Sequence, residues 1–414
     1  MSELEIHGGP KTRRRPFPAR NLVGEEERAA INALIDHALA TGEAINYNGD
    51  PTRQYEERFS EWMGGGHART VNSGTNALFC ALGALNLEPL SEVIVPPITD
   101  PGGVMPVLFL GCVPVPADGD PRSFNVSADG IAARITERTR AIVVAHIAGE
   151  PADMAPILEL ASAHGLKVVE DCSQAHGALY HGRKVGSFGH IASFSTMSGK
   201  HHCTGGQGGV VFTQDDELHR EAVRFADRGK DFRPDGMENV RAALNCNLDD
   251  LAATVGVCQL AKLPGILAVR RRNGELLRQA LADNPAVHLG WQVPGSESAY
   301  WFFRLAIDTD RLTCDKDAFC QALEAEGIPV GASYHNIPAK AQWFREQRVF
   351  GNSGWPWQCP AYRGERNPDY PMSAAEAAVA AHFIIPCHEK YTEHDICDIA
   401  DAIEKVTEHY LKDA

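Results

Sequence analysis

The sequence predicts an α/β protein in which a large domain, built on a mostly parallel central sheet, precedes a smaller α+β C-terminal domain. Its 414 residues exceed the usual size of one domain and can bury a large core without disulfides or metals. Short, continuous apolar runs alternate along the chain with helical stretches. This alternation is typical of a parallel sheet whose two faces are both covered by helices.

The expected elements follow one another in a simple order. Early helices are expected over residues 24–40, 52–63 and 76–85, with a turn at residues 72–75 before the third. Six strands are expected over residues 92–95, 113–116, 141–146, 167–170, 192–195 and 209–213. Later helices are expected over residues 151–164, 248–272 and 393–410, the last of them amphipathic. Mixed α and β signals begin after about residue 265, so we assign residues 1–264 to the large domain and 265–414 to the small one.

The composition argues against several classes of protein. Lysine and arginine total 39 against 54 acidic residues, a net charge of −15, which disfavours a nucleic-acid partner. The one basic run, residues 11–15, is expected to be a solvated tail or to pack at the chain end. Eleven cysteines without C-x-x-C spacing indicate free thiols in a reducing compartment. The N-terminus lacks a signal-peptide pattern and prolines interrupt the most apolar stretch, residues 93–115, so we expect a cytoplasmic protein without a membrane partner.

The chemically informative residues follow the expected strands. Asp171 comes after one strand, Lys200 lies a few residues beyond another, and Ser73-Gly74-Thr75 stands between a strand and a helix. In open α/β sheets, ligands bind outside the carboxyl ends of the strands. A helix N-terminus binds phosphate, a carboxylate can keep a pyridine nitrogen protonated, and a lysine can bond to an aldehyde. Together these residues suit an anionic aldehyde cofactor.

Residues 170–213 carry a longer pattern. They read ED-x-x-Q-x-HG, then G-x-x-x-G-x-x-G, then F-S-x-x-x-x-K and a glycine-rich turn. This pattern resembles the signature of the DegT/StrS-type sugar aminotransferases, which are pyridoxal-phosphate (PLP) enzymes of fold type I, the aspartate aminotransferase fold. The stretches NSGTNAL at 72–78, HIAGEPADM at 146–154 and LAATVGVCQL at 251–260 support the resemblance.

The resemblance implies a set of site residues. Lys200 would bond covalently to PLP and move the proton between Cα and C4′, and Asp171 would pair with the pyridine nitrogen. Asn245 would reach the phosphate of a neighbouring subunit, which implies a homodimer with shared active sites. The implied cofactor-binding residues are Gly74, Thr75, Asp171, Gln174, Ser195, Lys200 and Asn245.

The sequence also departs from the family pattern on the substrate side. Asp100 stands where the family usually has an aromatic residue over the cofactor ring, and Asn247 stands where it has an arginine. Tyr334 and His335 match a loop that often approaches substrate in this family. Arg228, Arg233 and Arg241 are candidate clamps for an anionic substrate group, and the sequence does not select among them.

Other kinds of site fit less well. The adjacent residues His201, His202 and Cys203 cannot all point at one ion, so we expect no metal. His176 is expected to be a packed, hydrogen-bonded histidine, with direct cofactor contact as the alternative. The chain lacks a G-x-G-x-x-G after an early strand and a Walker A motif, which disfavours a nicotinamide enzyme or a P-loop nucleotide site.

The resemblance implies a PLP-dependent aminotransferase of amino-sugar biosynthesis. L-glutamate or L-glutamine would donate the amino group, and the acceptor would be a keto sugar, nucleotide-linked, or a keto-cyclitol. Two alternatives remain open. One is a PLP-dependent sugar dehydratase or epimerase, since a minority branch with histidine in place of the lysine carries out dehydration. The other is a regulatory member that binds PLP without transamination.

Overall fold

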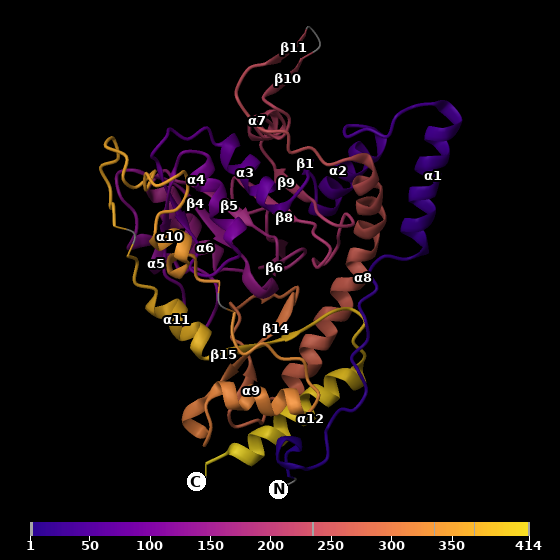
Figure 1. The fold of residues 1–414 in the computed structure, drawn as a ribbon, viewed down its shortest axis with the longest axis vertical. Coiled ribbons are helices and arrows are strands. Elements are labelled where there is room, and N and C mark those ends of the chain that lie inside the picture. The colour runs from indigo at the N-terminus through magenta and orange to yellow at the C-terminus, as the bar shows by residue number, and fades with distance from the viewer. Residues whose placement is uncertain (1–2, 234–235, 335, 368, 413–414) are drawn as a thin grey trace.

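The computed structural model describes residues 3–233, 236–334, 336–367 and 369–412 (Figure 1). Its centre is a seven-stranded sheet of order β1-β9-β8-β5-β4-β2-β3. Only β9 runs against its neighbours, which confirms the predicted mostly parallel sheet. The strands are β1 His67–Val71, β2 Glu92–Val95, β3 Val113–Pro116, β4 Thr139–Ala145, β5 Lys167–Asp171, β8 Ile191–Ser195 and β9 Gly209–Thr213. The edge strand β1 is the strand expected before Ser73; no residue range was assigned to it, because His67 and Arg69 interrupt its apolar pattern.

Helices cover both faces of this sheet. On β5, Val168 packs into one core cluster and Val169 into another, because successive side chains of a strand point to opposite faces. Both faces of the strand are therefore apolar, which explains its continuous apolar sequence. One cluster includes side chains of α2 (Asp50–Met63), α6 (Met154–Ala163) and α8 (Asp250–Ala280). The other includes α3 (Gly74–Ala84), α4 (Met105–Phe109) and α7 (Asp216–Ala226).

Helix α8 connects the two halves of the structure. It was expected to end near residue 272, but it continues to Ala280, because its last turns pack in the C-terminal core through Leu277. The helix is long and apolar enough by composition to cross a membrane. It nevertheless packs against α1 (Glu25–Thr41), α2 and α12 (Glu393–Tyr410), as a core helix does. The domain boundary between residues 264 and 265 lies inside α8 and stays a prediction.

A second, antiparallel sheet lies in the C-terminal part. Its order is β12-β14-β15, formed by Val287–Leu289, Phe302–Ile307 and His382–Pro386, and α9 (Lys316–Ala325) and α12 pack against it. The N-terminal segment also packs here. Arg13 is buried and forms ion pairs with Asp395 at 2.8 Å and with Asp398 at 2.5 Å, so the basic run packs at the chain end.

The remaining elements are short and lie mostly in connections. They are η1 Glu5–His7, η2 Pro101–Gly103, α5 Ala128–Ala132, η3 Ile147–Gly149, β6 Leu179–Tyr180, β7 Arg183–Lys184, β10 Lys230–Arg233, β11 Gly236–Asn239, β13 Ser296–Glu297, η4 Thr309–Arg311, η5 Pro338–Lys340, α10 Gln342–Arg345 and α11 Ser373–Ala380. The β10–β11 hairpin projects beyond the central sheet at the top of Figure 1.

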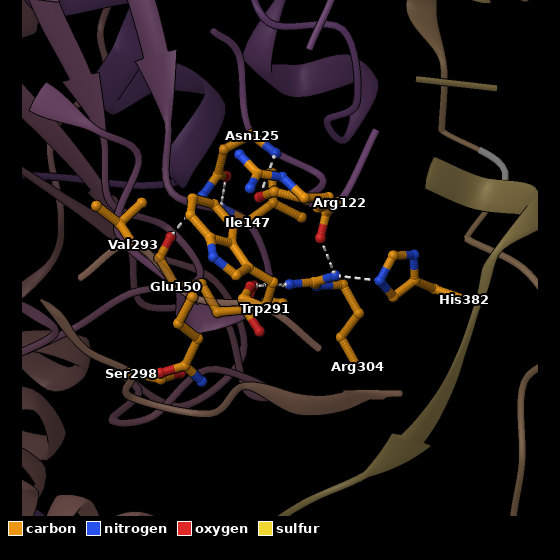
Figure 2. A network of polar contacts seen from close by, with 12 residues as sticks. Arg122, Asn125, Ile147, Glu150, Trp291, Val293, Ser298, Arg304 and His382 are labelled. Carbon is orange, nitrogen blue, oxygen red and sulfur yellow. Dashed lines mark hydrogen bonds and ion pairs between the residues drawn. The ribbon is translucent and has the colours of Figure 1, made fainter. Parts of the chain in front are cut away.

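A buried ion pair joins the second sheet to the turn that follows β4 (Figure 2). Arg304 on β14 donates two hydrogen bonds, of 3.0 and 2.7 Å, to Oε2 of Glu150. Its other N–H groups reach the main-chain oxygens of Arg122 and Trp291 at 2.8 and 2.6 Å. Asn125 holds the same turn, since its side-chain amide donates a hydrogen bond to the main-chain oxygen of Glu150. The arginine is fully buried and its hydrogen bonds are satisfied, so this contact fixes the turn against β14.

We predict that Arg304→Met lowers the free energy of unfolding by about 3–5 kcal/mol, because it leaves the buried Glu150 carboxylate without its counter-ion. Urea unfolding followed by circular dichroism measures this change. The control is Arg220→Ala, which removes an ion pair with Glu217 that is mostly exposed. Equal midpoints for the two variants would contradict the importance of the buried pair.

Candidate active site

A cavity of about 220 Å³ lies at the carboxyl ends of β4, β5 and β8, beside the N-terminus of α3. This is the edge of the sheet at which α/β proteins bind ligands. Six of the seven residues predicted to bind the cofactor line the cavity, although they are separated by up to 126 positions in the chain (200 − 74). They are Gly74, Thr75, Asp171, Gln174, Ser195 and Lys200.

One end of the cavity suits an anion. Ser73 caps α3 by accepting a hydrogen bond of 3.1 Å from the backbone N–H of Asn76. The N–H groups of Gly74 and Thr75 belong to the first turn, which has no earlier helical carbonyls to bond. A Cβ atom at Gly74 would overlap the side chain of Ser195. Glycine at this position therefore lets the helix end and the end of β8 approach closely enough to enclose a phosphate group.

The next wall carries a carboxylate and an amide. Asp171 is the last residue of β5, is 9% exposed, and accepts a hydrogen bond of 3.0 Å from the N–H of Ser173. Gln174 accepts from the N–H of Ala148 at 3.0 Å and donates to the hydroxyl of Tyr334 at 2.8 Å. Tyr334 thus reaches the site from the C-terminal part, as expected, whereas His335 lies outside the described residues.

Lys200 occupies the cavity as a buried amine, with 8% of the residue exposed. Burial lowers the pKa of Lys200 below its ordinary value, and the carboxylates of Asp171 and Asp100 partly oppose this effect. At a given pH the neutral amine is therefore more abundant than for a lysine in water. Arg20 holds the segment around it, donating hydrogen bonds to the main-chain oxygens of Gly199 at 2.9 Å and His201 at 3.0 Å.

Asn245 does not line the cavity of its own chain. It is exposed, and its side-chain oxygen accepts a hydrogen bond of 2.8 Å from Asn247. Its role in a neighbouring subunit stays a prediction. Arg228 and Arg241 bind Asp227 and Glu221 of their own chain and are not among the residues that line the cavity. The side chain of the third candidate, Arg233, lies outside what the structure describes.

The predicted histidines form a separate buried cluster. Nδ1 of His176 and Nδ1 of His202 lie 2.9 Å apart, and Nε2 of His202 lies 2.7 Å from the hydroxyl of Tyr55. His201 contacts the main-chain oxygen of Ala299 instead. Burial lowers the pKa of all three imidazoles, so they are neutral. None of them lines the cavity, which supports the packed, hydrogen-bonded role for His176.

Sequence reasoning missed His146, which lines the cavity directly after β4. Its Nε2 lies 3.1 Å from Glu170, and its Nδ1 accepts from the N–H of Ala152 at 3.0 Å. These partners place the proton on Nε2. The rule that selected residues after strands passed over this histidine, because the strand expected over 141–146 included it, whereas β4 ends at Ala145.

His146, Glu170 and Cys172 lie close enough together to suggest a metal site. Hydrogen bonds account for the cluster instead, because the Glu170 oxygens accept three backbone N–H groups, from Gly186, Phe188 and Gly189, at 2.6–2.7 Å. Burial raises the pKa of the Cys172 thiol well above its ordinary value, so no thiolate is offered. Glu170 therefore organises the turn after β7.

A buried lysine and a buried carboxylate facing a phosphate-sized helix N-terminus define an α/β enzyme that binds an anionic cofactor. The chain belongs to the DegT/DnrJ/EryC1/StrS aminotransferase family, whose model matches residues 25–404. Membership implies pyridoxal phosphate, and the cavity fits it: the α3 N-terminus suits the phosphate, and Asp171 and Lys200 suit the ring nitrogen and the aldehyde.

Relatives match along almost the whole chain. The GDP-perosamine synthase of Caulobacter vibrioides is 32% identical over 365 residues, which cover 85% of this chain and 89% of that protein. The L-glutamine:2-deoxy-scyllo-inosose aminotransferase of Streptomyces kanamyceticus is 30% identical over 443 residues, covering 99% and 97%. The X-ray structure of an aminotransferase from Psychrobacter cryohalolentis superposes with a TM-score of 0.81 at 29% identity, covering 97% and 100%.

We predict that Gly74→Ala weakens PLP binding about tenfold or more, because the added Cβ overlaps Ser195 and overpacking costs about 1–3 kcal/mol. Absorbance titration of cofactor-free protein measures the dissociation constant. Gly265→Ala is the matched control, since a Cβ at that position of α8 meets nothing within 4 Å. The same dissociation constant in both variants would argue against close packing of α3 on β8 as the phosphate cradle.

Proposed function

We propose that this aminotransferase takes an amino group from L-glutamate or L-glutamine in amino-sugar biosynthesis. The acceptor is either a nucleotide-linked keto sugar or a keto-cyclitol. PLP would be carried covalently by Lys200. The observation that carries the proposal is that Lys200, Asp171 and the N-terminus of α3 share one cavity. The names of the two curated relatives, a GDP-sugar synthase and a cyclitol aminotransferase, support the two acceptor classes.

Different residues of this chain have different roles in binding PLP and in moving protons. When bound, PLP supplies an electron-accepting ring conjugated to its aldehyde. The N–H groups of Gly74 and Thr75 bind the phosphate, and Asp171 holds a proton on the pyridine nitrogen. Lys200, whose pKa is lowered by burial, takes the proton from Cα of the donor and returns one at C4′. The lowered pKa increases the fraction of this amine that can act as a base.

The presence of a lysine at position 200 favours transamination over dehydration. A dehydratase of this family type would need a histidine at the position of Lys200. His201 instead contacts Ala299, and His202 contacts His176 and Tyr55 below the cavity. Only Lys200 of these three neighbours lines the cavity. The regulatory alternative differs in its prediction, since such a protein would bind PLP without processing a donor.

We propose further that the protein is a cytoplasmic homodimer with shared active sites. Asn245 supports the dimer, because it is exposed and lies away from the cavity of its own chain. Exposed apolar side chains on nearby segments, Phe232, Val240 and Leu244, offer a surface for a second copy. The eleven cysteines are all free thiols, which supports a reducing compartment.

We predict that Lys200→Ala lowers the rate of amino transfer by about 10²–10⁴-fold or more, because the variant loses the proton-transferring amine. The test follows the visible absorbance of the PLP-loaded protein after separate additions of L-glutamate and L-glutamine. The parent should bleach with one donor, and Lys184→Ala, on β7, should behave like the parent. A parent spectrum that neither donor changes would contradict transamination, and equal rates for Lys200→Ala and the parent would contradict the role of Lys200.

Mixed dimers test the shared site. Lys200→Ala and Asn245→Asp should each be nearly inactive, the second because its carboxylate repels the partner's phosphate. When the two chains are mixed, half of the dimers carry both, and one of the two sites in each is intact. Activity should therefore return to about one quarter of the parent value. No recovery after verified chain exchange would place Asn245 in its own chain's site or outside the site.

A further inference from the structure

Trp301 touches the side chain of Lys200 from the junction before β14. The Lys200 amine lies 4.2 Å from the centroid of the Trp301 ring, over its face. The edge of the same indole donates an Nε1–H hydrogen bond of 3.2 Å to the main-chain oxygen of Gly199. One side chain thus contacts both the amine and the backbone beside it, although the two positions are 101 residues apart (301 − 200).

The position of the indole is set by the turn that lines the cavity. The N–H of Trp301 donates to the oxygen of Ala148 at 2.9 Å. Ala148 has a φ of 63°, a left-handed conformation that is unusual for alanine, and its own N–H is bound by Gln174. Because Arg304 and Glu150 hold the end of this turn, the backbone to which Trp301 is hydrogen-bonded is fixed in position. Trp301 is partly buried and contacts Lys200, which lines the cavity.

The charged groups around the amine do not replace this contact. Asp171 and Asp100 act on Lys200 as negative charges, and Arg20 lies behind its backbone. His176, on whose pKa the Lys200 charge acts, is buried and neutral. With cofactor bound, Asp171 is engaged at the pyridine nitrogen in the proposed function. The ring face of Trp301 attracts a cation without forming an ion pair, so it can hold the amine and release it again.

We propose that the face of Trp301 is the docking place of the Lys200 amine during the part of the cycle in which that amine is not bonded to cofactor. The inference rests on the proposed function, in which Lys200 alternates between a bonded and a free state. Trp301 is then a positioning residue: it stabilises the protonated amine and keeps it beside the cavity. It also provides an aromatic surface next to the lysine in a site where Asp100 replaces the usual aromatic residue.

The experiment measures the titration of the free Lys200 amine. The cofactor-loaded protein is converted to its amino form with donor and labelled with acetic anhydride at pH values from 6 to 11. Peptide mass spectrometry then gives the pH at which Lys200 is half reactive. The variants are Trp301→Leu, which removes the ring, and Trp301→Phe, which keeps a ring but loses the Nε1–H group; Trp301→Met replaces the leucine variant if that variant folds poorly.

We predict that Trp301→Leu lowers this half-reactive pH by about half to one pH unit, because the protonated amine loses its cation–π partner. Trp301→Phe should stay closer to the parent. Lys184, whose amine lies 5.4 Å from the ring of Trp62, is the internal control and should not change in any variant. A merely structural role of Trp301 would alter stability without this ordered change in titration.

Two outcomes would overturn the inference: an unchanged half-reactive pH in Trp301→Leu, or equal changes in the phenylalanine and leucine variants, which would assign the effect to the Nε1–H group. Failure of the proposed function is detected separately. Borohydride reduction of the PLP-loaded parent should add the cofactor mass to the peptide that contains Lys200. Cofactor mass on another lysine would refute the proposed function whatever the titration shows.

Discussion

In the central sheet, β3, β2, β4, β5 and β8 all run in the same direction, and the rest of the structure depends on this constraint. Parallel strands end at one edge, so the residues after them meet there although they are far apart in the chain. Asp171 ends β5, Lys200 follows β8 and His146 follows β4, and all three line one cavity. The helices on both faces exclude water from the sheet. Lys200 is also buried at the edge of the sheet, and this burial lowers its pKa.

Segments outside the central sheet also contact the residues that line the cavity. Arg20 comes from the N-terminal segment, and Trp301 and Tyr334 come from the part of the chain after α8. The buried pair of Arg304 and Glu150 ties the second sheet to the turn that carries Ile147 and Ala148. Movement of the C-terminal part would therefore be felt at the lysine. The central sheet and the C-terminal part thus both contribute contacts around Lys200.

One departure from the family pattern, Asp100, lines the cavity, whereas the other, Asn247, is bonded to Arg69 and Asn245 away from it. Asp100 is exposed at the mouth of the cavity and caps η2 by accepting from the N–H of Gly102. It adds negative charge near Lys200, where an aromatic ring was expected. Trp301 supplies the aromatic surface from the opposite side of the lysine segment. This chain therefore places a carboxylate and an indole beside Lys200.

The sequence by itself determined most strands of the central sheet, several of the helices that cover it, and six residues that line the cavity. Apolar periodicity and capping residues act over a few positions, so six strands and the helices α1, α2, α3 and α6 could be predicted within a few residues, although α7 was not. Lys200 and Asp171 were recognisable because each follows an expected strand. Only the tertiary structure decided three features: the end of α8 at Ala280, the contact of Trp301 with Gly199, and the contacts of Arg20. These features arise from contacts between residues about 100 or more positions apart, as with Asn273 and Tyr391, and no local pattern encodes which distant surfaces will pack together.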